Sequence, residues 1–177
     1  DHRDLHSFPT RRSSDLTRTH TLRLELSENF TLKSFKSWST DTRFVRGLML
    51  KNEYYVRQAD KGLFRLEGDD FKLVSGTEFF GKEPLSVLLP FPGKGEKTIL
   101  LGGQLTGFFL LDGSSLSKFP TEVDQLIKAG ALLQAGLQHE GNIILGFLGR
   151  GVVIMNPKGE IIRSEEHTSE LQSHHDL

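Results

Sequence analysis

The stretches GLFRLEG (residues 62–68), GFFLLDG (107–113) and GVVIMNPKG (151–159) share one pattern, a glycine followed by a short apolar run and a turn. Their first glycines are 45 and 44 residues apart. Apolar triplets precede the three stretches at the same offset, at residues 54–56, 99–101 and 143–145. Similarity at a fixed period of this length indicates a repeated structural unit.

Each unit is predicted to form four short strands joined by tight turns. The first unit has its strands at residues 44–50, 53–58, 62–67 and 70–74. Gly68-Asp69 and Asp112-Gly113 lie where two-residue hairpin turns need a positive φ, which Gly and Asx residues tolerate. Four-stranded units with this period are typical of β-propeller blades, whereas leucine-rich, ankyrin and tetratricopeptide repeats are shorter and contain helices.

We therefore predict an all-β fold, a partial β-propeller of about three four-stranded antiparallel blades plus part of a fourth. Leu22–Phe35 resembles the outer two strands of a preceding blade. Thr121–Lys128 opens with a Thr-x-x-Asp spacing that could cap one helical turn. Because this segment falls between two units, we interpret it as a connector.

Both ends of the chain match translated sequencing adapters. Residues 163–173, RSEEHTSELQS, reproduce a common library adapter read from its first base, and residues 6–16, HSFPTRRSSDL, reproduce its partner. One adapter precedes the insert and the other follows it, as in a single library molecule. We therefore interpret residues 1–16 and 163–177 as adapter-derived and non-native, and 17–162 as the propeller fragment. The adapter-derived ends are expected to make few contacts with the interior.

Excluding the ends alters the charge balance. The whole chain has 22 Lys/Arg and 23 Asp/Glu, a net charge of −1, and removing the four and seven that lie in the ends leaves 18 and 16, a net charge of +2. This balance predicts no nucleic-acid partner and no direct membrane contact. The chain has no cysteine, which excludes disulfides and thiolate chemistry. No apolar run approaches the ~20 residues that span a bilayer.

The interior offers few residues for catalysis. Five of the seven histidines lie in the ends, leaving His20 and His139. His139 stands beside Glu140 in a predicted turn, and a general base would also need a partner acid and a substrate cleft. We favour a solvated turn histidine. The sequence thus predicts a protein that is not an enzyme, with no catalytic, metal or cofactor residues and no cofactor, and it leaves the ligand-binding residues unknown.

Three further patterns have a structural and a functional interpretation. Gly102-Gly103 and Gly146–Gly151 resemble phosphate loops, but strands are predicted on both sides, which favours close packing and hairpin turns. Asn29-Phe30-Thr31 matches the glycosylation acceptor pattern, and we interpret it as a chance match. The first unit also carries a basic strip, which consists of Arg43, Arg46, Arg57, Lys61 and Arg65. We interpret it by default as a solvated strand face. The alternative is an anionic-ligand surface on the propeller funnel.

The phrase Glu140-Gly141-Asn142, followed by Ile143–Gly146 and Gly149-Arg150-Gly151, resembles the repeats of sensor propellers in bacterial two-component-type regulators. Phe119–Asp124 is similar to an inter-blade phrase of the same family. Members often carry Asp before the turn glycine and Trp in the next strand, where this chain has Glu140 and Ile143. In this family the propellers precede a three-tyrosine immunoglobulin-like module and a cytoplasmic signalling output.

The resemblance implies a ligand-sensing, non-catalytic segment of a bacterial membrane-bound signal-transduction protein. It places the segment on the periplasmic or extracellular side of the inner membrane. The expected partners are an unknown small-molecule or glycan ligand and the neighbouring blades of the full propeller. Two alternatives stay open: a cytosolic protein-interaction propeller, and a fragment of a propeller lyase or glycosidase.

Overall fold

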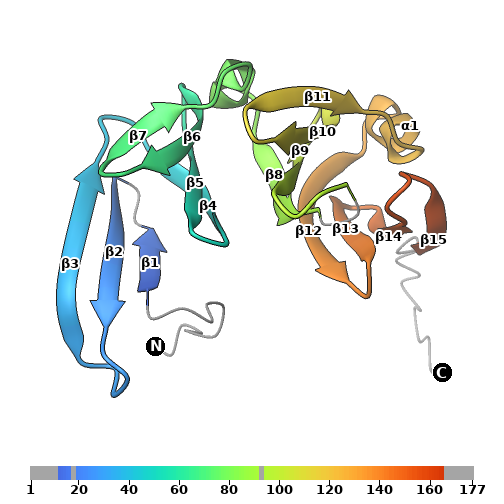
Figure 1. Ribbon diagram of the computed structural model, residues 1–177. Coiled ribbons are helices and arrows are strands. Elements are labelled where there is room, and N and C mark those ends of the chain that lie inside the picture. Colours follow the sequence, from blue (N-terminus) through green and yellow to red (C-terminus); the bar gives the residue numbers. More distant parts are fainter. Residues whose placement is uncertain (1–11, 17–18, 92–93, 166–177) are drawn as a thin grey trace, which may run out of the picture.

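The computed structural model describes residues 12–16, 19–91 and 94–165, and of residues 12–16 it describes the main chain alone. The described chain is all-β with one α-helix and one 3-10 helix (Figure 1). The elements in chain order are β1 Arg12–Leu16, β2 His20–Leu26, β3 Leu32–Ser39, β4 Phe44–Leu50, β5 Glu53–Gln58, β6 Gly62–Glu67, β7 Asp70–Leu73, η1 Glu78–Gly81, β8 Leu85–Pro90, β9 Thr98–Gly103, β10 Gly107–Asp112, β11 Ser115–Phe119, α1 Val123–Lys128, β12 Leu132–His139, β13 Asn142–Leu148, β14 Gly151–Met155 and β15 Ile161–Glu165.

The strands form four antiparallel sheets, each built from consecutive strands. The first sheet is β1–β3, the second β4–β7, the third β8–β11 and the fourth β12–β15. Figure 1 shows the sheets following one another along an open arc, with their first strands on the inside and their last strands on the outside. The inner strands β4, β8 and β12 are neighbours in this order. The arrangement is blade-like, as the repeat predicts.

The predicted repeat is confirmed at the level of strands and of residues. The four strands expected in the first unit match β4–β7, with only the last one residue shorter. Gly62, Gly107 and Gly151 each begin the third strand of a sheet, with φ of 128°, 76° and 85°. Because each opens the third strand of its sheet with a positive φ, the three positions are structurally equivalent. Glycine adopts these angles without the steric cost of a Cβ atom.

One predicted turn is displaced by a residue. β10 extends through Asp112, so the two-residue turn to β11 is Gly113-Ser114 and not Asp112-Gly113. The corresponding turn between β6 and β7 is Gly68-Asp69, as expected. In both turns the first residue is a glycine with positive φ, 62° at Gly68 and 61° at Gly113, which is typical of type II′ hairpins.

The expectation that the adapter-like ends make few contacts is wrong for the part of them that the structure describes. The main chain of Arg12–Leu16 pairs with Thr21–Glu25 of β2, so the first sheet has three strands. Arg163–Glu165 continue β15 beside Val152–Ile154. An open sheet edge offers main-chain donors and acceptors to any extended segment, whatever its side chains. Phe8 and Leu171, expected outside the core, lie beyond the described residues.

The core consists of apolar layers between adjacent sheets. Tyr54 and Val56 face the first sheet, while Tyr55, between them on β5, belongs to the layer between the second and third sheets. Likewise Leu100 faces the fourth sheet, and its neighbours on β9 face the second. Because side chains alternate along a strand, a strand covered on both faces needs apolar residues at successive positions. This explains the apolar triplets of the repeat.

The predicted connector is confirmed as the short helix α1, and η1 takes the same place after the second sheet. Asp124 Oδ2 accepts a hydrogen bond from the Thr121 N–H at 2.8 Å, while the buried Thr121 hydroxyl makes none. The Thr-x-x-Asp spacing therefore supplies half of a capping box. Val123 and Ile127 are buried between the third and fourth sheets, so the helix also closes that layer.

Candidate functional site

His139 lies at the end of β12, and its side chain is 67% exposed. Its Nε2 is 3.8 Å from Glu140 Oε1, in a hairpin turn whose residues Glu140 and Gly141 both have positive φ. These features fit the predicted solvated turn histidine. Within residues 19–91 and 94–165, no three His, Cys, Asp or Glu side chains come together in a way that could hold a metal ion.

The glycine pairs that resemble phosphate loops are strand and turn positions. Gly102 lies in β9, where an added Cβ would come within 2.8 Å of Val87 Cβ and 2.9 Å of a Phe108 ring carbon. Close approach between strands therefore requires glycine there. Gly149 and Gly151 flank the turn from β13 to β14, and both have positive φ. Asn29-Phe30-Thr31 forms part of the exposed turn between β2 and β3.

The basic strip does not form a uniform solvated face. Lys61 pairs with Asp41 at the surface, and Arg65 pairs with Glu67. Arg57 is only 6% exposed, so the default interpretation is wrong for this residue. Arg46, its cross-strand neighbour, is half-buried. The structure thus divides one run of cations into an ion-paired part, a buried part, and the exposed Arg43, which has no ion pair with a described carboxylate.

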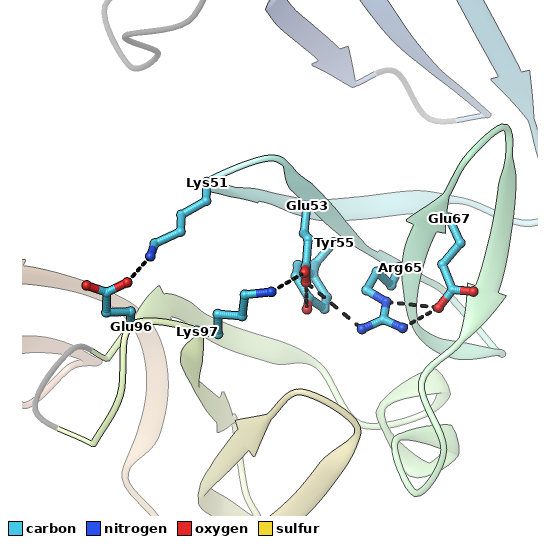
Figure 2. Close-up of polar contacts among 7 residues, drawn as sticks. All are labelled: Lys51, Glu53, Tyr55, Arg65, Glu67, Glu96 and Lys97. Carbon is cyan, nitrogen blue, oxygen red and sulfur yellow. Dashed lines mark hydrogen bonds and ion pairs between the residues drawn. The ribbon is translucent and has the colours of Figure 1, made fainter.

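A polar network joins the second sheet to the third at the edge of their shared layer (Figure 2). Lys51, in the β4–β5 turn, pairs with Glu96, and Lys97 Nζ lies 3.2 Å from Glu53 Oε1. Arg65 Nη1 is 4.0 Å from Glu53 Oε2. Three cations from two sheets therefore contact two carboxylates, so the network links the sheets electrostatically.

Tyr55 is the buried member of this network and bonds directly to Glu53. The Tyr55 hydroxyl donates to Glu53 Oε2 at 2.7 Å. That hydrogen bond, followed by Lys97 and Arg65, holds the pKa of Glu53 below its ordinary value. Burial, then the carboxylate of Glu53, raises the pKa of Tyr55 to about 12. Tyr55 thus remains a protonated donor at neutral pH and Glu53 an ionised acceptor.

The network balances its charges internally and presents no activated base or nucleophile. The Arg65 guanidinium also donates to Glu67, which adds the matching negative charge. We assign the network a positioning role, because it fixes the second sheet against the third. Its signal was present in the sequence, since Lys51 and Glu96 are 45 residues apart and Glu53 and Lys97 are 44 apart. Opposite charges one repeat apart predict pairing between neighbouring units.

Comparisons with known proteins place the chain in no family, because no family model and no curated protein matches it. Among the described residues, none of the helices has the length and apolar character needed to cross a bilayer.

Proposed function

We propose that residues 17–162 are a ligand-sensing, non-catalytic segment of a β-propeller in a bacterial membrane-bound signal-transduction protein. The observation that carries the proposal is the repeated up-and-down sheet whose first strand lies beside the first strands of its neighbours. Sheets arranged in this way around an axis are the blades of a propeller. The further blades of the complete ring would then be the partners of the two terminal sheets.

Binding is favoured over catalysis by the way the polar groups are used. The carboxylates between the second and third sheets are engaged by Lys51, Lys97 and Arg65, and Glu83 accepts hydrogen bonds from the N–H groups of Leu105 and Thr106. Such groups hold the sheets and turns in place. A rigid frame that presents loops at its rim is a frequent basis for recognition.

The resemblance of Glu140–Asn142 and its following strand to sensor repeats supports the signalling context and the periplasmic or extracellular location. The same proposal treats residues 1–16 and 163–177 as adapter-derived, even though some of them extend sheet edges. Main-chain pairing at an edge requires no particular side chains, so it is compatible with a non-native origin.

Recovery of the genomic sequence that encodes residues 17–162 tests the proposal. We expect the reading frame to diverge from this chain near residues 17 and 162, and to continue into further repeats of about 45 residues. A downstream membrane helix and signalling domain are expected. Their absence would favour a cytosolic interaction propeller, while a convergent carboxylate pair or histidine cluster in the complete ring would favour a lyase or glycosidase. Either result contradicts the sensor proposal.

A further inference from the structure

We propose that Arg43, Arg46 and Arg57 form a binding site for an oxyanion, a carboxylate or a phosphate or sulfate group carried by a small molecule. The inference builds on the proposed function, because it names the chemistry of the sensed ligand. Its basis is a contrast within the basic strip: Lys61 and Arg65 have carboxylate partners, whereas these three arginines make no ion pair with any described carboxylate.

The three arginines lie on the same side of the second sheet. Arg46 and Arg57 are direct cross-strand partners on β4 and β5. The carbonyl of Arg43 accepts the N–H of Ala59, two residues beyond Arg57, which places Arg43 on the same side across the bulge in β4. Burial lowers the pKa of Arg57, and the nearby positive charge of Arg43 lowers it further. A bound anion would offset this repulsion between Arg43 and Arg57.

Arg57 is held rigidly by main-chain oxygens. Its Nε donates to the carbonyl of Phe80 at 2.6 Å and its Nη2 to the carbonyl of Gly81 at 3.0 Å. These bonds orient the guanidinium, but neutral carbonyls do not cancel its charge. Asp60 and Glu83 attract Arg57 electrostatically without contacting it. Arg57 therefore contributes a fixed, buried positive charge on the side of the sheet that it shares with the other two arginines.

Arg46 supplies the open donors of the site. Its side chain is half-buried and makes no hydrogen bond or ion pair with the described residues. Burial alone lowers its pKa, since no charged neighbour contributes. A guanidinium has five N–H donors, and removing them from water without acceptors is costly. An oxyanion can accept two of them in the bidentate geometry that arginine favours. Arg43, which is exposed, can contact the same anion from the solvent side.

The site lies on the side of the second sheet that faces the third. Arg46 is on β4, which is the first strand of its sheet and a neighbour of β8. Figure 1 shows these first strands on the inside, where a complete ring would enclose a central channel. Ligand binding here would act on the second sheet beside its junction with the third, which the network of Figure 2 holds together.

Equilibrium dialysis of the full chain with labelled inorganic phosphate and, separately, with acetate tests the site at constant ionic strength. The parent for all variants is the chain carrying Leu137→Lys and Val152→Lys, two exposed positions on the fourth sheet chosen to keep it soluble. We expect saturable binding of at least one probe, and the preferred probe distinguishes a phosphate-like ligand from a carboxylate. Arg46→Gln should weaken binding at least about tenfold, as loss of a charged hydrogen-bond donor does. Lys61→Gln is the matched control, because its cation is already paired with Asp41, and it should change binding less than about twofold.

The melting temperature distinguishes an anion site from a purely structural role for Arg46, in which Arg46→Gln would lower it. If the site needs an anion, Arg46→Gln keeps or raises the melting temperature in anion-free buffer, while phosphate or acetate raises that of the wild type. Arg46→Lys retains the charge but not the bidentate fork, and it should also bind more weakly. Absent saturable binding, or wild-type affinity in both Arg46 variants, overturns the inference. If the anion binds but the complete gene encodes no signalling domain, only the proposed function is overturned.

Discussion

The third sheet is covered on both faces, whereas the first and fourth sheets are each covered on one. In the third sheet Ile99, Leu100 and Leu101 are all fully buried. In the fourth, Ile143 and Leu145 are buried at the equivalent positions, but Ile144 between them is only half-buried. The same apolar triplet thus has different surroundings according to its place in the row. Apolar residues remain exposed on the outer faces of the terminal sheets: Leu32 and Phe35 on the first, and Leu137 and Val152 on the fourth.

This difference indicates how much an inner sheet gains from having a neighbour on each face. A stacked unit gains its stability from its interfaces as much as from its own hydrogen bonds. When a terminal apolar face of a few hundred Å² stays uncovered, the chain loses stabilising free energy of burial on the order of several kcal/mol, at about 25 cal/mol per Å². Since domains are stable by only ~5–15 kcal/mol, two such faces decide the behaviour of the chain.

The largest expected effect is therefore on assembly. We expect the chain as written to be insoluble, oligomeric or partly molten. Among the described residues, nothing covers its terminal faces or pairs with the outer edges of β1, β3, β12 and β15. Leu137→Lys with Val152→Lys should shift soluble material toward monomer in sedimentation velocity. A wild-type monomer with a sharp melt above about 60 °C, the upper end of the usual mesophile range, would contradict the contrast between covered and uncovered faces.

Truncation of equivalent triplet residues sharpens the same contrast. Leu100→Ala should lower the free energy of unfolding by about 2–5 kcal/mol, because it opens a cavity between two covered layers. Ile144→Ala at the corresponding place in the fourth sheet should cost less than about 1.5 kcal/mol, since its side chain is only half-buried. Urea unfolding of a solubilised background measures both. Equal losses would mean that the outer face of the fourth sheet is covered in solution.

The smallest effect concerns the polar network at the second and third sheets. Tyr55 has its pKa raised to about 12, so the stability it contributes is present below pH 10 and is lost as the pH rises toward 12. Tyr55→Phe should remove this alkaline loss, a change of about 1–3 kcal/mol between pH 9 and pH 12. Denaturant unfolding across this range measures it.

Glu53→Gln provides the acid counterpart and a control for the Tyr55 variant. The pKa of Glu53 is lowered, so its contribution is present at neutral pH and is lost as the pH falls through that lowered value. The variant should flatten the decline in stability toward pH 3, by about 1 kcal/mol or less because Glu53 is partly exposed. If Glu53→Gln leaves the pH profile unchanged, its ion pair with Lys97 does not hold the two sheets together.

Much of the fold could be predicted because it is encoded at short range. The glycines at the start of β6, β10 and β14 have positive φ, and turn glycines and apolar triplets repeat at the same spacing. Each of these signals lies within one unit and is reinforced by the next. The strand Arg12–Leu16 was not predictable, because its pairing with β2 depends on an open edge and not on its own residues.

Side chains on the same strip show what sequence patterns cannot resolve. Arg57 and Arg65 are eight residues apart and belong to one basic run, yet Arg57 donates to carbonyls of the segment 80–81 while Arg65 contacts Glu53 and Glu67. The two side chains have different partners because different segments of the chain pack against their strands. The candidate anion site therefore required the structure, although its residues were noted in the sequence.

By itself, the sequence determined the all-β class, the 44–45-residue unit, the strand positions in that unit and the connector before the fourth sheet. Only the tertiary structure decided which alternate residues face which neighbour, which cations are paired and which sheet faces stay uncovered. The physical reason is that turn geometry and strand alternation are local properties of the backbone. Burial and charge compensation depend instead on contacts between sheets whose residues are about one repeat apart in the chain.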